Sequence, residues 1–217
     1  MPTLSDVRQP RAVAIVRGAI ARGRLHHALL LTGPRGAGKR DLTLAVAAAL
    51  NCEAAPGEGC GTCAVCERIA NGIHPDVITL AREGAAQIIP IETVRQQVVA
   101  AVGLPPHEAR ERVFVIDEAT ALQPAAANAL LKTLEEPPAR TRFILGTTAP
   151  DQLLPTIRSR CQRISLGALD ADARRAAGDD ALATAAEALL DAIDRGPGAA
   201  IRVAQKISEE KLDAGAV

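Results

Sequence analysis

A short run of residues near the N-terminus carries the clearest chemical signal of the sequence. It matches the phosphate-loop template GxxxxGK[ST] at every position but the last. In this template the glycines let backbone N–H groups turn toward a polyphosphate, and the helix that follows adds its dipole. The lysine reaches the β- and γ-phosphates. The residues predicted to bind phosphate are Gly33, Pro34, Arg35, Gly36, Ala37, Gly38, Lys39 and Arg40.

Arg40 is the departure from the template. It stands where Ser or Thr would offer a hydroxyl to Mg²⁺. A long cation at that position would repel Mg²⁺, although it could pair with a phosphate. ATP with Mg²⁺ is therefore a candidate ligand, but the presence of Arg40 argues against it. We expect the loop to bind nucleotide without hydrolysing it.

Two carboxylates follow a later apolar segment. Asp117 and Glu118 come directly after the stretch 113–116. In phosphate-loop proteins an acid at the end of such a strand organises Mg²⁺ and water. This pattern predicts Asp117 beside the metal and Glu118 beside the attacking water. The plainer alternative is a strand that ends in two solvated acids.

Four of the five cysteines lie within residues 52–66. The two Cys-x2-Cys steps let sulfurs converge on one tetrahedral ion. Because the chain lacks a secretion signal, clustered cysteines favour a metal over disulfides. An all-thiolate shell leaves no open position, which favours structural zinc, with iron–sulfur ligation or unligated thiols as alternatives. The predicted ligands are Cys52, Cys60, Cys63 and Cys66, which complete a site without the nearby His74.

Alternating strand and helix patterns must position these groups. The patterns predict an α/β fold, in which a mostly parallel sheet is covered by helices on both faces. Residues 52–66 are rich in Gly, Cys and Pro and are predicted to be a loop inserted into this core. The expected strands are 28–32, 77–80, 112–116, 142–147 and 163–166, and the expected helices are 11–22, 42–50, 91–102 and 125–134.

The pattern changes near Gly167. Residues 168–217 are rich in alanine and have the spacing of short packed helices. We therefore expect a core domain over 1–167 and a small helical lid domain over 168–217.

Composition counts against several classes of partner, although a local charged patch remains possible. Lys plus Arg and Asp plus Glu each number 25 in 217 residues, so no global charge attracts nucleic acid or an anionic membrane. Two Phe and no Trp or Tyr count against single-strand binding by base stacking. No apolar run approaches the roughly 20 residues of a membrane span, and no signal-peptide core is present. We expect a cytoplasmic protein that does not contact a membrane.

Two further motifs point to a family. The segment 128–138, NALLKTLEEPP, followed by Ser159-Arg160-Cys161, closely resembles the ATPase core of the AAA+ subunits of the bacterial DNA polymerase III clamp loader. The resemblance covers residues 25 to about 166 and implies an AAA+ P-loop NTPase-like fold. It also implies that Arg160 is an arginine finger for the ATP of a neighbouring subunit, and that Thr148 is a polar sensor. Taken alone, Arg160 and its neighbouring arginines would be a solvated basic edge.

Details of the resemblance favour one subunit type. Residues 72–77 and 89–95 look like the delta-prime subunit rather than gamma or tau, and the motor subunits have Thr after the loop lysine. The motor subunits also carry a sensor arginine in the small helical domain. Ala199 falls at the matching position here, with Arg202 near it but out of register.

The resemblance implies a delta-prime-like subunit. Such a subunit would hydrolyse little or no ATP itself, supply its finger in trans, and scaffold the ATP-dependent loading of the sliding clamp during DNA replication. Its implied partners are the gamma or tau and delta subunits, and through the complex the sliding clamp and primer-template DNA. Full subunits continue into a C-terminal collar domain, whereas this chain stops at Val217.

Two alternatives remain open. An active gamma- or tau-like ATPase is one, because Asp117 and Glu118 are retained. A zinc-bearing scaffold or nucleic-acid module with a vestigial nucleotide site is the other.

Overall fold

The computed structural model describes residues 1–169. The lid predicted over 168–217, together with Ala199 and Arg202, therefore lies outside the described residues except for its first two positions. Within residues 1–169, no helix combines the length and the hydropathy needed to cross a membrane.

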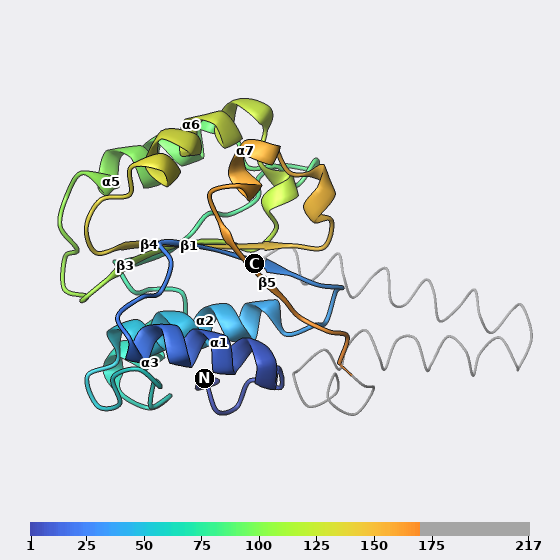
Figure 1. Cartoon of the computed structure of the whole chain (residues 1–217). Helices are drawn as coiled ribbons and strands as arrows, with labels where there is room; N and C mark the ends of the chain where they lie inside the picture. Colours follow the sequence, from blue (N-terminus) through green and yellow to red (C-terminus); the bar gives the residue numbers. More distant parts are fainter. Residues whose placement is uncertain (170–217) are drawn as a thin grey trace, which may run out of the picture. The chain divides into compact units, whose positions relative to one another are not determined.

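Five parallel strands form one sheet in the order β2-β3-β4-β1-β5 (Figure 1). All four strand pairings are parallel. The α/β prediction is confirmed, and each predicted strand is present within one residue at either end. The strands are β1 (Ala28–Thr32), β2 (Val77–Thr79), β3 (Arg112–Ile116), β4 (Thr141–Thr147) and β5 (Gln162–Ser165).

Helices cover both faces of the sheet (Figure 1). On one face lie α1 (Pro10–Ala21), α2 (Lys39–Asn51) and α3 (Ala64–Ala70). The other face carries α4 (Ile91–Thr93), η1 (Val94–Val99), α5 (Ala100–Val102), α6 (Pro124–Glu135) and α7 (Pro155–Arg158). Single 3-10 turns, η2 (Ala119–Ala121) and η3 (Pro150–Gln152), follow β3 and β4.

Two predicted elements differ in detail from the structure. The helix expected over 91–102 is continuous but has wider π-helical turns at Val94–Val99. The insertion 52–66, expected to be a loop, ends inside α3, so that Cys66 lies on a helix. Apolar periodicity does not distinguish an α-helix from a helix with a π segment. The cysteines obscure the periodicity of α3, which is too short to be recognised as a helix from the sequence.

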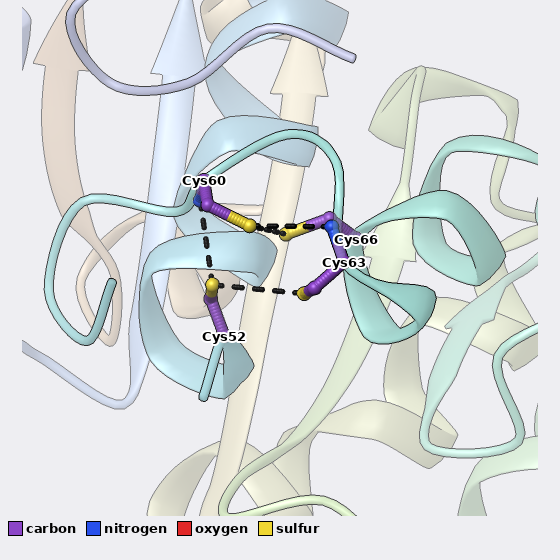
Figure 2. Close-up of side chains that lie close together, drawn as sticks. All are labelled: Cys52, Cys60, Cys63 and Cys66. Carbon is purple, nitrogen blue, oxygen red and sulfur yellow. Dashed lines mark hydrogen bonds between the residues drawn. The ribbon is translucent and has the colours of Figure 1, made fainter. Parts of the chain in front are cut away.

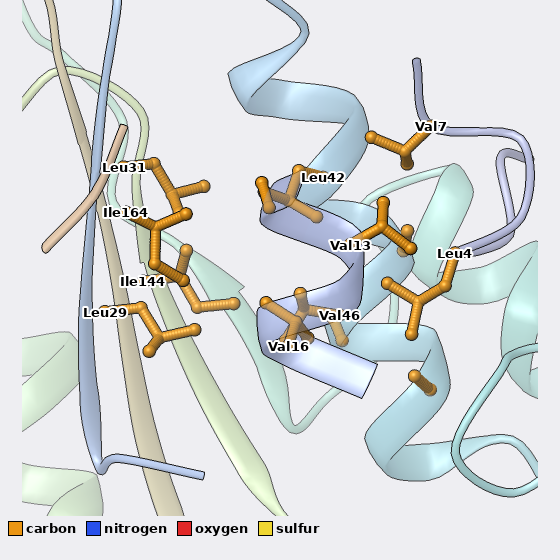
Figure 3. Packing of buried hydrophobic residues seen from close by; sticks show 14 of the residues in the cluster. Leu4, Val7, Val13, Val16, Leu29, Leu31, Leu42, Val46, Ile144 and Ile164 are labelled. Carbon is orange, nitrogen blue, oxygen red and sulfur yellow. The ribbon is translucent and has the colours of Figure 1, made fainter. Parts of the chain in front are cut away.

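The sheet residues alternate between two apolar layers. Leu29, Leu31, Ile144 and Ile164 pack toward α1 and α2, as Figure 3 shows. The intervening positions face α6 and η1 and include both phenylalanines of the chain, whose rings stack with centroids 5.1 Å apart. The sheet is thereby buried on both faces, which is typical of parallel sheets.

Gly146 brings two strand ends close together. A Cβ at this position of β4 would lie only 2.5 Å from the backbone oxygen of Asp117. Because a side chain cannot be fitted there, glycine allows the end of β3 to approach β4. The backbone of Asp117 is thereby fixed against the middle of the sheet.

One connecting segment crosses the sheet. Residues 148–161 run from the carboxyl end of β4 to the amino end of β5, and β1 lies between these two strands. Leu153 and Ile157 of this segment belong to the same apolar cluster as α6. The segment therefore packs on the α6 face and spans the length of the phosphate-loop strand.

Candidate functional site

The predicted phosphate loop joins β1 to α2. Gly36 and Gly38 have φ values of 69° and 76°, in the left-handed region that favours glycine. Helix α2 begins at Lys39, immediately after Gly38. The loop residues therefore surround the N-terminus of a long helix, an arrangement that suits an anion.

Lys39 folds over its own loop. Its Nζ donates to the backbone oxygens of Gly33 and Pro34, at 2.8 Å each. Burial lowers the pKa of this ammonium, and the nearby Glu118 carboxylate opposes the shift. The lysine charge thus lies between the loop and the acids that end β3.

Arg40 pairs with Asp117. Its Nη1 lies 3.0 Å from Oδ2 of Asp117 across the loop. The arginine side chain is 70% exposed, so the contact lies at the surface. The two positions at which the template expects Mg²⁺ ligands are therefore joined to each other.

Glu118 is held by two threonines. Its Oε1 accepts from Oγ1 of Thr120 at 2.8 Å, and its Oε2 accepts from both N–H and Oγ1 of Thr148 at 3.3 Å. Burial alone would raise the pKa of Glu118, but these hydrogen bonds lower it. The predicted sensor and the predicted water-polarising acid are thus in contact at the edge where the strands end.

Arg160 lies at the opposite edge of the sheet. Gln162, which follows closely, pairs with Leu29 near the beginning of β1. From Leu29 to Gly33 the strand rises about 13 Å, at about 3.3 Å per residue. Arg160 is therefore separated from the chain's own phosphate loop by nearly the full length of β1.

Acceptors of the same chain fix the Arg160 guanidinium. Its Nη2 donates to Oε1 of Glu135 at the end of α6, and its Nη1 donates to the backbone oxygen of Thr156 at 2.9 Å. A further, longer contact of Nη1 reaches Oγ of Ser159. The guanidinium is consequently held in one orientation on the α6 face.

The four clustered cysteines converge (Figure 2). Their sulfurs all lie within 4.8 Å of one another, with Cys52 and Cys63 at 3.8 Å and Cys60 and Cys66 at 3.9 Å. A tetrahedral ion with Zn–S bonds of about 2.3 Å requires sulfurs about 3.8 Å apart. The spacing of these thiols therefore fits a zinc ion.

Backbone donors favour the thiolate form of Cys60, whereas burial raises the pKa of Cys66 to about 12. The Sγ of Cys52 accepts from N–H of Ala55 and Cys60, and the Sγ of Cys60 accepts from N–H of Cys63, all at 3.3 Å. Backbone N–H groups, with that of Thr62 foremost, lower the pKa of Cys60 to about 6. The cluster can therefore provide thiolate ligands for a metal ion.

His74 belongs to a different contact network. It is buried, its Nε2 lies 3.6 Å from Oε1 of Glu108, and its Nδ1 accepts from N–H of Asp76. Burial lowers its pKa, which favours the neutral ring, while the Glu108 carboxylate opposes this shift. His74 is not among the residues that form the cysteine cluster.

Sequence reasoning missed two contact residues. Glu135 falls within the quoted segment 128–138, but its contact with Arg160 spans 25 positions. Thr120 follows Glu118 by two positions, and its role as a donor emerges only from the 3-10 turn η2. Arg158, two residues before Arg160, pairs with Asp151 at 3.0 Å.

A family model described as "DNA polymerase III, delta subunit" matches residues 8–170 of the chain. Among curated relatives, the DNA polymerase III subunit tau of Salmonella typhimurium is 39% identical over 172 residues, covering 78% of this chain and 26% of that protein. The subunit delta-prime of Escherichia coli is 42% identical over 141 residues, covering 64% of this chain and 42% of that protein. The chain spans about a quarter of the length of the tau relative and about two fifths of the length of the delta-prime relative.

A solved structure shares the fold. It is a DNA polymerase III gamma subunit-related protein from Thermotoga maritima, with a TM-score of 0.52 and 21% identity. The match covers 72% of this chain and 46% of that one. Together with the parallel five-stranded sheet and its flanking helices, this likeness shows that the two proteins share an α/β fold.

Proposed function

The chain belongs to the bacterial DNA polymerase III clamp-loader family, and on that premise we propose that it is a delta-prime-like subunit, which supplies Arg160 to the ATP site of a neighbouring motor subunit. In this role it hydrolyses little or no ATP itself. It would also scaffold the complex that loads the sliding clamp during DNA replication.

The placement of Arg160 carries the proposal. Arg160 and the phosphate loop lie near opposite ends of β1, which supports contact of Arg160 with a phosphate bound to another molecule. A guanidinium beside a transferring phosphoryl group neutralises developing charge, an effect worth about 10³ to 10⁵ in rate. Its planar fork also suits phosphate oxygens.

Asp117 and Glu118 keep a second candidate function in view. Both acids stand at the end of β3 beside Lys39, and the tau relatives are as similar to this chain as the delta-prime relative is. An active gamma- or tau-like ATPase would need another group in place of the missing hydroxyl. The Arg40 contact with Asp117 favours the delta-prime-like role.

The partners follow from the role. A gamma or tau subunit would bind the surface around Arg160, with a delta subunit elsewhere in the complex. The sliding clamp and primer-template DNA would be reached through the assembled loader. Zinc would hold the insertion at 52–66 together without taking part in hydrolysis.

Reconstitution with a gamma or tau subunit and a delta subunit tests the proposal. For Arg160→Ala, we expect the complex to assemble while single-turnover hydrolysis at the adjoining motor site falls by about 10³-fold or more. Arg158→Ala is the matched control, since Arg158 lies on the same segment and pairs with Asp151 instead. Unchanged hydrolysis by an intact Arg160→Ala complex would overturn the proposal.

A further inference from the structure

The pair formed by Arg40 and Asp117 occupies the position where phosphate-loop proteins hold Mg²⁺. Arg40 replaces the hydroxyl that would bind the ion from the first turn of α2, and Asp117 is the acid that would bind it from the end of β3. The guanidinium and the carboxylate are joined by a 3.0 Å contact. The residues present do not fit Mg²⁺.

Charge and ligand chemistry both disfavour the ion. Mg²⁺ requires oxygen ligands in a near-octahedral shell, and a guanidinium offers only N–H donors. A divalent ion at Asp117 would also lie next to the fixed positive charge of Arg40. Since arginine stays protonated in proteins, this repulsion persists across the accessible pH range.

Arg40 can supply part of the positive charge that Mg²⁺ would otherwise supply at the phosphates. Its described contact uses Nη1 alone, and the side chain is mostly exposed beside the loop. The ammonium of Lys39 lies against the backbone oxygens of the same loop, and α2 begins at this residue. A second fixed cation at this place would neutralise phosphate oxygens that Mg²⁺ otherwise bridges.

We propose that Arg40 substitutes for Mg²⁺, so that the chain binds a nucleoside di- or triphosphate without a divalent cation and retains it unhydrolysed. The inference rests on the proposed function only in taking the loop for a nucleotide site. The bound nucleotide would then stabilise the subunit and would not serve as its source of energy.

Nucleotide affinity measured with and without metal tests this inference. The purified full chain is titrated with ATP by calorimetry, once with excess Mg²⁺ and once with EDTA. For the wild type we expect Kd values that agree within about threefold, because the fixed cation is present in both titrations. For Arg40→Thr we expect binding at least about tenfold tighter with Mg²⁺ than with EDTA, since the hydroxyl ligand is restored.

Arg35→Thr is the matched control. Arg35 is an exposed arginine of the same loop. Its loss should weaken binding similarly in both titrations and should create no dependence on Mg²⁺. Arg40→Lys, which keeps the charge without the fork, should remain independent of metal, and it provides a second variant if Arg40→Thr folds poorly.

Several outcomes would overturn the inference. These are a wild-type affinity that rises tenfold or more with Mg²⁺, the absence of ATP binding under both conditions, or an Arg40→Thr protein that folds and remains independent of metal. None of these results bears on Arg160, whose role is read from hydrolysis at a neighbouring subunit. The two proposals can therefore fail separately.

Discussion

Arg112 and Asp76 form a buried ion pair at the edge where the strands begin. Nε and Nη2 of Arg112 lie 3.2 and 3.0 Å from Oδ1 of Asp76, and the two side chains are 8% and 0% exposed. The carboxylate also accepts three backbone N–H groups, from residues 107–109. Arg112 in turn donates to the backbone oxygens of Leu104 and Pro105, so the pair fixes the connection between α5 and β3.

This pair predicts a loss of stability in acid. Burial alone would raise the pKa of Asp76, but the backbone donors and Arg112 lower it from 3.8 to about 2. The folded state therefore binds fewer protons than the unfolded state between these values. The resulting contribution, roughly 2 kcal/mol, is present above pH 4 and is lost as the pH falls toward 2.

Urea unfolding at a series of pH values measures this contribution. Asp76→Asn should be less stable than the wild type by about 3 kcal/mol or more at pH 7, because Arg112 loses its buried charge partner. The difference between the two proteins should shrink as the pH falls from 4 to 2. A constant difference across that interval would contradict the assignment.

Removing a clustered thiol should remove the metal. We expect the purified chain to carry about one zinc per molecule, and Cys63→Ser to lose most of it together with several degrees of thermal midpoint. Elemental analysis and thermal melts provide the measurements. Cys161→Ser is the control, since Cys161 lies outside the cluster. Equal zinc contents in both variants would exclude this site.

Gly146→Ala should destabilise the acidic end of β3. The added Cβ would lie 2.5 Å from the backbone oxygen of Asp117, and both strands are fixed by their pairing in the sheet. We expect a loss of about 1–3 kcal/mol in the free energy of unfolding. Gly103→Ala, where a Cβ meets nothing within 4 Å, should stay within about 0.5 kcal/mol of the wild type. Equal stabilities for the two variants would count against the close approach of Asp117.

Glu135 should act as a positioning residue for Arg160. In the reconstituted complex, Glu135→Gln would weaken the hold on the guanidinium and lower kcat at the neighbouring site by about threefold to tenfold, with KM for ATP unchanged. Glu136→Gln provides the control, since Glu136 is an exposed acid next to Glu135. If Arg160→Ala abolishes hydrolysis and Glu135→Gln leaves kcat intact, Glu135 has no such role.

The sequence predicted those parts of the fold that local patterns encode. Strands β1 and β3 are apolar runs that end at Gly33 and Asp117, and the phosphate loop and cysteine spacing are local motifs. Contacts between distant residues could not be predicted in this way. Arg40 was identified as unusual, but its partner Asp117 lies 77 positions later. Asp76 and Arg112 have the residue types of an exposed loop and an exposed strand end, but the pairing of β2 with β3 and the connection at 104–109 enclose them.

Residues 148–161 connect two distant parts of the candidate site. Thr148 at one end touches Glu118 beside the phosphate loop, whereas Arg160 at the other end lies against Glu135 on the far edge. Both ends are clamped to strands that flank β1, and the middle is packed on α6. This one segment of 14 residues therefore carries both the threonine that contacts the acid beside the phosphate loop and the arginine that we propose acts on a neighbouring subunit.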